Sequence, residues 1–97
     1  MYINKNDSFL YTCKENYFLG IHPLSADSKI FKGYKTLVEI AKAFFDQNRY
    51  DLFLNYLNEE KYLCDVWAAH MIVEFGSPDV AVKEICIKIL KKVEMVK

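Results

Sequence analysis

The strongest constraint in this chain is one segment, residues 65–75, which is apolar on almost every side of the helix it would form. Only His70 and Glu74 interrupt the apolar surface, and they lie one turn apart, so they form a narrow polar wedge. A helix that is apolar nearly all round is enclosed by other elements. Ala68 and Ala69 are small and let a neighbouring helix come close. The rest of the chain is therefore expected to fold around residues 65–75.

An amphipathic helix is predicted before this segment, from about residue 29 to residue 47, with Asp27 or Ser28 as its cap. Gly33 lies beside the apolar stripe of this helix, where it either permits a close helix crossing or weakens the helix. A shorter helix is predicted over about 50–57. The residues expected to be buried in these two helices are Ile30, Tyr34, Leu37, Ile40, Ala41, Phe44 and Phe45, and then Leu52, Phe53, Tyr56 and Leu57.

The sequence Gly-Ser-Pro-Asp at residues 76–79 separates the central segment from a last helix. We expect Gly76 at the C′ position with a positive φ, Ser77 as N-cap and Pro78 as the first residue of a helix over about 78–95. Val80 and Ile87 lie opposite its apolar stripe, either as ordinary exposed residues or as part of a docking surface. The expected buried residues of this helix are Val82, Ile85, Cys86, Ile89, Val93 and Val96.

The first 28 residues support two alternatives. Residues 8–18 carry a helical apolar stripe made of Phe9, Leu10, Cys13 and Tyr17. Tyr11, Phe18 and Leu19 fall outside that stripe, and residues 17–21 also suit a strand. We therefore predict an all-α fold over a single domain, residues 1–97, built as a small antiparallel bundle of four to five helices, with a strand as the alternative before residue 29.

Charge and cysteine content narrow the class of protein. The chain has 13 Lys and Arg against 13 Asp and Glu, whereas nucleic-acid-binding domains usually carry a basic excess, so no nucleic-acid partner is expected. Its three cysteines form no CxxC pair, which does not suit the even disulfide framework of small secreted domains. We see no apolar signal segment at the N-terminus and no run long enough to span a membrane. We therefore expect a cytoplasmic protein with no membrane partner.

Catalytic and metal-binding motifs are absent from the sequence. There is no phosphate-binding glycine loop, HExxH or GxSxG motif, and the three glycines are far apart. His70 and Glu74 are spaced for acid–base work, but a surface ion pair is the more common role of such a pair. The cysteines and histidines match none of the common ligand spacings. We therefore expect no enzyme activity, no metal and no cofactor.

The segment from Leu52 to Leu90 resembles a HEAT-like helical hairpin. Leu52-Phe53-Leu54 lies in one helix, Val66-Trp67-Ala68-Ala69 opens the next, and Met71-Ile72-Val73-Glu74-Phe75-Gly76 leads into a third. The arginine usual before the alanines is missing, and Asp65 lies nearby instead. The segment is similar to small bacterial HEAT-like proteins, some of which are immunity proteins of polymorphic or contact-dependent toxins. This resemblance implies hairpin packing and the binding of a cognate bacterial toxin.

Taken together, these observations favour a protein-binding module, specifically an immunity protein that neutralises a cognate toxin domain. The alternatives are a structural subunit that forms a homo-oligomer through the last helix, and a small enzyme or metal protein that uses His70, Glu74 and the cysteines. Trp67 is expected in the core or, alternatively, partly exposed at the interface. The residues expected to contact the partner are Glu59, Glu60, Asp65, Trp67, His70, Glu74, Lys83 and Ile87.

Overall fold

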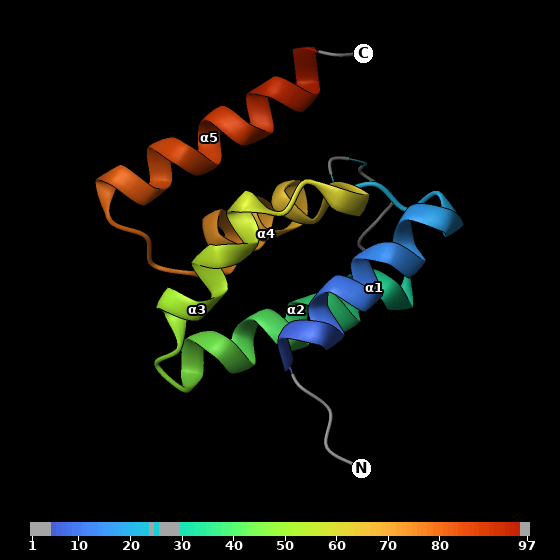
Figure 1. Ribbon diagram of the computed structural model, residues 1–97, viewed down its shortest axis with the longest axis horizontal. Helices are drawn as coiled ribbons and strands as arrows, with labels where there is room; N and C mark the ends of the chain where they lie inside the picture. Colours follow the sequence, from blue (N-terminus) through green and yellow to red (C-terminus); the bar gives the residue numbers. More distant parts are fainter. Residues whose placement is uncertain (1–4, 24, 26–29, 96–97) are drawn as a thin grey trace.

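The computed structural model describes residues 5–23, 25 and 30–95, with side chains placed for residues 9–23, 25 and 30–92. This part of the chain is helical and contains no strand, as the sequence predicts. Figure 1 shows the order of the elements. The five α-helices and two 3-10 turns are α1 (Lys5–Leu19), α2 (Lys32–Asp46), α3 (Tyr50–Leu54), η2 (Asn55–Asn58), η3 (Lys61–Leu63), α4 (Cys64–Phe75) and α5 (Val80–Met95).

The helices are arranged around α4 (Figure 1). Helices α1 and α2 form an antiparallel pair on one side of α4, while α5 packs antiparallel to α4 on the other side. The short α3 and η2 link the two halves, and η3 brings the chain back past α1 before α4 begins. Each of the other helices therefore packs either on α4 directly or on an element that contacts α4.

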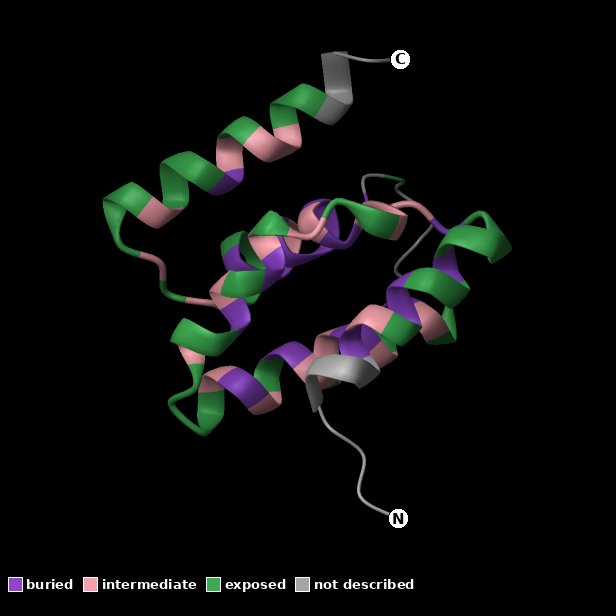
Figure 2. Ribbon diagram, in the orientation of Figure 1, coloured by how far each residue is buried: buried purple, intermediate pink, exposed green. Residues whose placement is uncertain are grey.

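Helix α4 is the buried centre that its composition predicts. Figure 2 shows buried residues concentrated on α4 and on the inner sides of α1 and α2. Trp67 is completely buried, so the core interpretation of this residue is confirmed and the exposed alternative is wrong. The buried residues of α4 are Cys64, Val66, Trp67, Ala68, Ala69, Met71 and Ile72. Because this helix is enclosed on several sides, each neighbour needs only one apolar stripe.

The apolar stripe of α2 is confirmed, with one exception. Tyr34, Leu37, Ala41 and Phe44 are buried, while Ile40 and Phe45 of the expected set are half-buried. Ile30 is 73% exposed, because it precedes the helix and does not share the direction of the stripe. The proposed caps at residues 27 and 28 lie outside the described residues.

The segment between α2 and α4 supplies the aromatic part of the core. The Phe53 ring lies 4.9 Å from the Phe9 ring and 5.4 Å from the Phe44 ring, measured between centroids. Tyr56 lies 4.6 Å from Phe9, so α1, α2 and η2 meet around these rings. Leu52 was expected in the buried set, but it is 37% exposed, since Phe53 is the residue of α3 that is buried.

Helix α1 continues through residues 17–19, so the strand alternative for residues 17–21 is wrong. Phe9 and Cys13 are buried as expected, whereas Tyr17 is 52% exposed. The buried side of α1 instead includes the polar residues Thr12 and Asn16. Helix α1 therefore meets α2 through a polar side, which its apolar stripe does not indicate.

The connection between α4 and α5 differs from the expected capping pattern. Gly76 has a φ of −93°, so the prediction of a positive φ is wrong. A Cβ at Gly76 would lie 2.9 Å from the Ile72 carbonyl oxygen and 3.0 Å from the Tyr50 hydroxyl, so this glycine is needed for close packing. Helix α5 begins at Val80, and the Val82 N–H donates to the Asp79 carboxylate at 2.9 Å. Asp79 is therefore the N-cap, in place of Ser77.

Helix α5 is the least enclosed helix of the bundle, since it packs mainly on α4. Cys86 is its buried residue among those described, and Val82 and Ile89 are half-buried. Ile85 was expected in the buried stripe but is 48% exposed, and Val82, Ile89 and Leu90 pack against the core instead. The side chains of residues 93 and 96 lie outside the described set.

Candidate functional site

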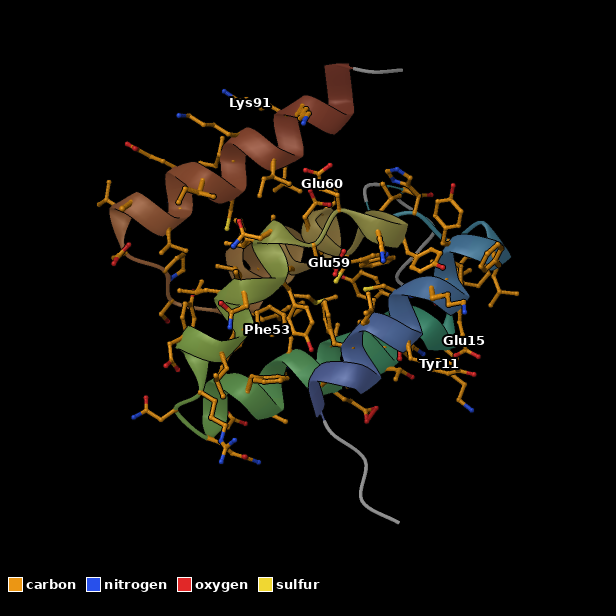
Figure 3. The ribbon with its side chains drawn as sticks, in the orientation of Figure 1. Tyr11, Glu15, Phe53, Glu59, Glu60 and Lys91 are labelled. Atoms are coloured by element: carbon orange, nitrogen blue, oxygen red, sulfur yellow. The ribbon has the colours of Figure 1, made fainter. Side chains whose placement is uncertain are left out.

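Three of the four acidic residues expected at the interface lie at or just before the start of α4, and two of them support the local backbone. The Asp65 N–H donates to the Glu59 carbonyl at 2.7 Å, and the Lys61 N–H donates to the Glu59 carboxylate at 3.2 Å. The Asp65 carboxylate accepts the Val66 N–H at 2.8 Å. Glu60 is exposed, and Figure 3 shows it on the side of the molecule that faces α5. Glu59 and Asp65 therefore stabilise the turn that leads into α4.

The environment of Asp65 raises its pKa. Burial is the largest cause, and the charge of Glu60 raises the pKa further. The hydrogen bond from Val66 and the positive charge of Lys92 act in the opposite direction. Lys92 on α5 thus lies within electrostatic reach of the start of α4, so this acidic group already faces a cation of the same chain.

His70 joins α2 to α4. Its Nε2 lies 2.7 Å from the Tyr34 hydroxyl, and its ring lies 5.6 Å from the Tyr34 ring. Tyr34 also contacts the buried Trp67 ring, at 5.8 Å between centroids. Burial raises the pKa of Tyr34, and the negative charge of Glu74 raises it further. His70 and Trp67 therefore serve the packing between helices, and Trp67 has no surface to offer a partner.

The remaining expected contacts are separated from the acidic group. Glu74 is exposed at the far end of α4, about 14 Å along the helix from Asp65 at 1.5 Å per residue. Lys83 is exposed and Ile87 is half-buried on α5. The predicted residues thus occupy the two ends of α4 and one side of α5, and they do not form one continuous surface.

The cysteines show no sign of a metal site. Cys13, Cys64 and Cys86 are free and buried. Burial raises the pKa of Cys13, and a hydrogen bond with the Cys64 thiol raises it further. Burial raises the pKa of Cys86 to about 11. Across the described ranges, no three His, Cys, Asp or Glu side chains are grouped as metal ligands would be.

The helices described here include none with the length and apolar character needed to cross a membrane.

A different surface, on α1, stands out by its exposed apolar side chains. Tyr11, Tyr17, Phe18 and Leu19 are 61%, 52%, 70% and 72% exposed, and we call these four residues the α1 apolar surface. Figure 3 shows Tyr11 and Glu15 extending from the same side of α1. Helical spacing at i, i+4 and i+7 adds Phe18 to that side. One short helix thus presents four large apolar groups to solvent.

Tyr62 extends the α1 apolar surface from a neighbouring segment. Its ring lies 5.7 Å from Tyr17 and 5.9 Å from Phe18, and the Lys14 ammonium lies 5.9 Å from its centroid. Tyr62 and Leu63 have φ values of 54° and 59°, and such left-handed backbone costs roughly 1–2 kcal/mol for each residue that is not glycine. The turn before α4 is therefore held in a strained form that places Tyr62 against α1.

A groove of about 260 Å³ runs between α1 and α2. We call it the α1–α2 groove, and its lining residues are Thr12, Glu15, Asn16, Leu19, Lys32, Gly33 and Thr36. A Cβ at Gly33 would overlap the Asn16 Oδ1 and lie 2.9 Å from the Asn16 Cγ. The prediction that Gly33 permits a close helix crossing is therefore confirmed. Leu19 is shared by this groove and the α1 apolar surface, so the two adjoin.

Asn16 is the unusual residue of this groove. It is 1% exposed, and neither its Oδ1 nor its Nδ2 has a hydrogen-bond partner among the described residues. Buried side-chain amides in proteins normally have partners, because an unpaired donor or acceptor loses its hydration without compensation. The sequence did not indicate this residue, since an Asn within a helix is most often exposed.

The residues of the α1 apolar surface had a signal in the sequence. Tyr11, Phe18 and Leu19 fall outside the helical stripe of residues 8–18, a mismatch that leaves a strand over residues 17–21 as the alternative to the predicted helix. In the helix that forms, the same mismatch exposes them.

No known protein family, curated protein or solved structure matches this chain. The candidate site therefore rests on the chain's own geometry: a five-helix domain with an exposed apolar surface beside a polar groove.

Proposed function

We propose that this chain is a protein-binding module and that its partner is a cognate toxin domain, which it neutralises by direct contact. The observation that carries the proposal is the α1 apolar surface, whose four side chains are 52–72% exposed. Large exposed apolar groups on one helix favour a protein interface, because covering them removes apolar area from water. Tyrosine is also enriched among the residues that dominate binding energy.

The toxin as partner is supported by the resemblance of residues 52–90 to small bacterial HEAT-like proteins that include immunity proteins. The proposed contact surface, however, lies on α1, outside the segment that carries the resemblance. A neutralising protein acts by affinity alone, so a surface with apolar anchors and no assembled catalytic group suits this role.

Co-expression with the product of the adjacent gene tests this function. Wild-type protein is expected to protect cells from that product and to co-purify with it. Phe18→Ser is expected to weaken binding at least about tenfold, as loss of an interface anchor does. Val80→Ser is the matched control, because Val80 is 74% exposed on α5, away from the proposed surface. If wild-type protein neither protects nor co-purifies, the proposal is wrong.

A second candidate function is a structural subunit that forms a homo-oligomer through α5. The observation in its favour is that Val80 and Ile85 are 74% and 48% exposed on this helix. Light scattering separates the two proposals. A monomer at high concentration rejects the homo-oligomer, whereas an oligomer that Ile85→Ser dissociates and Phe18→Ser leaves intact supports it.

A further inference from the structure

The Asn16 side chain is buried, and its amide has no hydrogen-bond partner among the described residues. A buried amide without partners destabilises a fold relative to an apolar side chain of similar size. The Asn16 amide has one acceptor oxygen and two N–H donors, and none of them is used within the described part of the chain. A polar group kept at such a position is explained if it gains its partners when another molecule fills the groove.

The charges on the groove walls indicate what that molecule is. Glu15 lines the groove from α1 and Lys32 lines it from α2. An anion would be repelled by Glu15 and a cation by Lys32, so the walls favour a neutral group with a positive and a negative end. The Thr36 hydroxyl donates to the Lys32 carbonyl at 3.0 Å, which leaves its oxygen available as an acceptor. A peptide group has this neutral, dipolar character and both hydrogen-bonding functions.

The size of the groove sets the length of the occupant. Its volume is about 260 Å³, and a water molecule occupies about 30 Å³ of liquid. The space thus equals about eight or nine waters, which suits one or two residues of an extended chain better than a helix. Leu19 lines the groove and is 72% exposed, so side chains of the same segment would contact the α1 apolar surface.

We propose that the α1–α2 groove binds a main-chain peptide group of an extended segment of the protein partner, with Asn16 as its hydrogen-bonding residue. This inference rests on the proposed function and adds to that function the part of the partner that is recognised. Both polar atoms of Asn16 are covered in the free protein. The carboxamide therefore turns from Gly33 toward the groove as the segment enters, donating to its carbonyl and accepting from its N–H.

A titration with the blocked peptide acetyl-Ala-Ala-Ala-amide tests the groove without any natural partner. In the ¹⁵N-labelled protein, the Asn16 side-chain NH₂ signals and the Gly33 backbone N–H are expected to shift and saturate at millimolar peptide. The side-chain signals of Asn55 and Asn58, which are exposed outside the groove, are expected to stay unchanged. Signals of Asn16 and Gly33 that do not move would overturn the proposal.

Asn16→Leu is the decisive variant, because it removes the unpaired amide while keeping a side chain of similar size. It is expected to fold, as reported by the fluorescence of the buried Trp67, and to lose the peptide-induced shift of Gly33. Asn16→Ala removes the same amide with less bulk and is expected to give the same loss. The matched control Asn55→Leu makes the same change at an exposed position and is expected to bind as wild type does. A Gly33 shift that persists in Asn16→Leu and Asn16→Ala contradicts the role of Asn16.

Binding to the product of the adjacent gene separates this inference from the function on which it rests. If wild-type protein binds and Asn16→Leu binds at least about tenfold more weakly, both proposals are supported. If the two proteins bind equally, the groove proposal is wrong and the function stands. If wild-type protein does not bind this product, the proposed function fails, and the peptide titration alone decides the groove.

Discussion

Replacing Gly33 by alanine provides the sharpest test of the packing between α1 and α2. The added Cβ would overlap the Asn16 Oδ1 and lie 2.9 Å from Cγ and 3.2 Å from Nδ2. Overpacking of this kind costs about 1–3 kcal/mol. Alanine favours a helix over glycine by up to about 1 kcal/mol. The net expectation for Gly33→Ala alone is therefore a loss of about 1–2 kcal/mol in the free energy of unfolding.

The same substitution has the opposite expected sign when Asn16 is alanine. The three nearest atoms to the added Cβ all belong to the Asn16 side chain, so Asn16→Ala removes the overlap and leaves the helix preference. Gly33→Ala is then expected to stabilise by up to about 1 kcal/mol. The expected coupling energy between the two positions equals the overpacking cost, about 1–3 kcal/mol, which is typical of residues in direct contact.

Urea unfolding of wild type, both single variants and the double variant measures this coupling. Trp67 is the only tryptophan and is completely buried, so its fluorescence reports global unfolding. Asn16→Ala alone is expected to cost little, because it removes a buried amide that has no partner among the described residues. If Gly33→Ala changes stability by the same amount in both backgrounds, the contact between Gly33 and Asn16 does not exist as described.

Three further predictions concern the cap of α5, a buried tyrosine hydroxyl and the thiols. Asp79→Ala removes the cap of α5 and is expected to cost about 1 kcal/mol in urea unfolding, while Ser77→Ala is expected to change little. Tyr50→Phe removes a buried hydroxyl that lacks a partner in the described structure, so it is expected to stabilise by up to about 1 kcal/mol. Burial raises the pKa of Tyr50 in the folded state. Its contribution to the free energy of unfolding is therefore complete below the ordinary pKa of about 10 and is lost as the pH rises through the folded pKa. The free energy of unfolding of Tyr50→Phe is expected to fall less than that of wild type between about pH 9 and pH 11. A thiol reagent at about pH 8 is expected to label the native protein far more slowly than the protein in urea, because the three thiols Cys13, Cys64 and Cys86 are buried.

The parts of the fold that the sequence predicts well are those whose pattern is local. Residues 65–75 are apolar on almost every side, and that pattern favours enclosure. Most of α4 is buried accordingly, whereas Val73 and Phe75 in its last turn are 36% and 38% exposed. In α2 the stripe from Tyr34 to Phe44 repeats at the helical period, so its buried side follows from spacing alone. Burial in these two helices needs no knowledge of the neighbouring elements.

The helix boundary before α5 could not be resolved in the same way. Ser77 and Asp79 are both good caps, and they stand two residues apart. The difference in free energy between two such caps is small, so the packing of the connection decides between them. Gly76 illustrates the point, because the Ile72 carbonyl and the Tyr50 hydroxyl require its lack of a Cβ, and this contact depends on where α3 lies.

The candidate site was missed because it depends on which side of α1 meets α2. The helical stripe of α1 correctly indicates Phe9 and Cys13 as buried. It gives no reason to bury Asn16, whose position follows from the close approach at Gly33 on another helix. Among the residues expected to bind a partner, Asp65 and His70 instead make contacts within the chain.

The distribution of polarity in α1 is the reason to prefer this helix as the binding element. A helix that served only the core would turn its large apolar residues inward and its amides outward. Helix α1 instead buries Asn16 and exposes Phe18 and Leu19, which are 70% and 72% exposed. Both departures lower the stability of the free protein, and exchanging the two kinds of side chain would relieve both. The proposed partner would account for both, because it would cover the apolar groups and pair with the amide, so that the arrangement that weakens the free domain would strengthen the complex. If Asn16→Leu and Phe18→Ser each left partner binding unchanged, this common cause would be excluded, and α1 would have to be explained by folding alone.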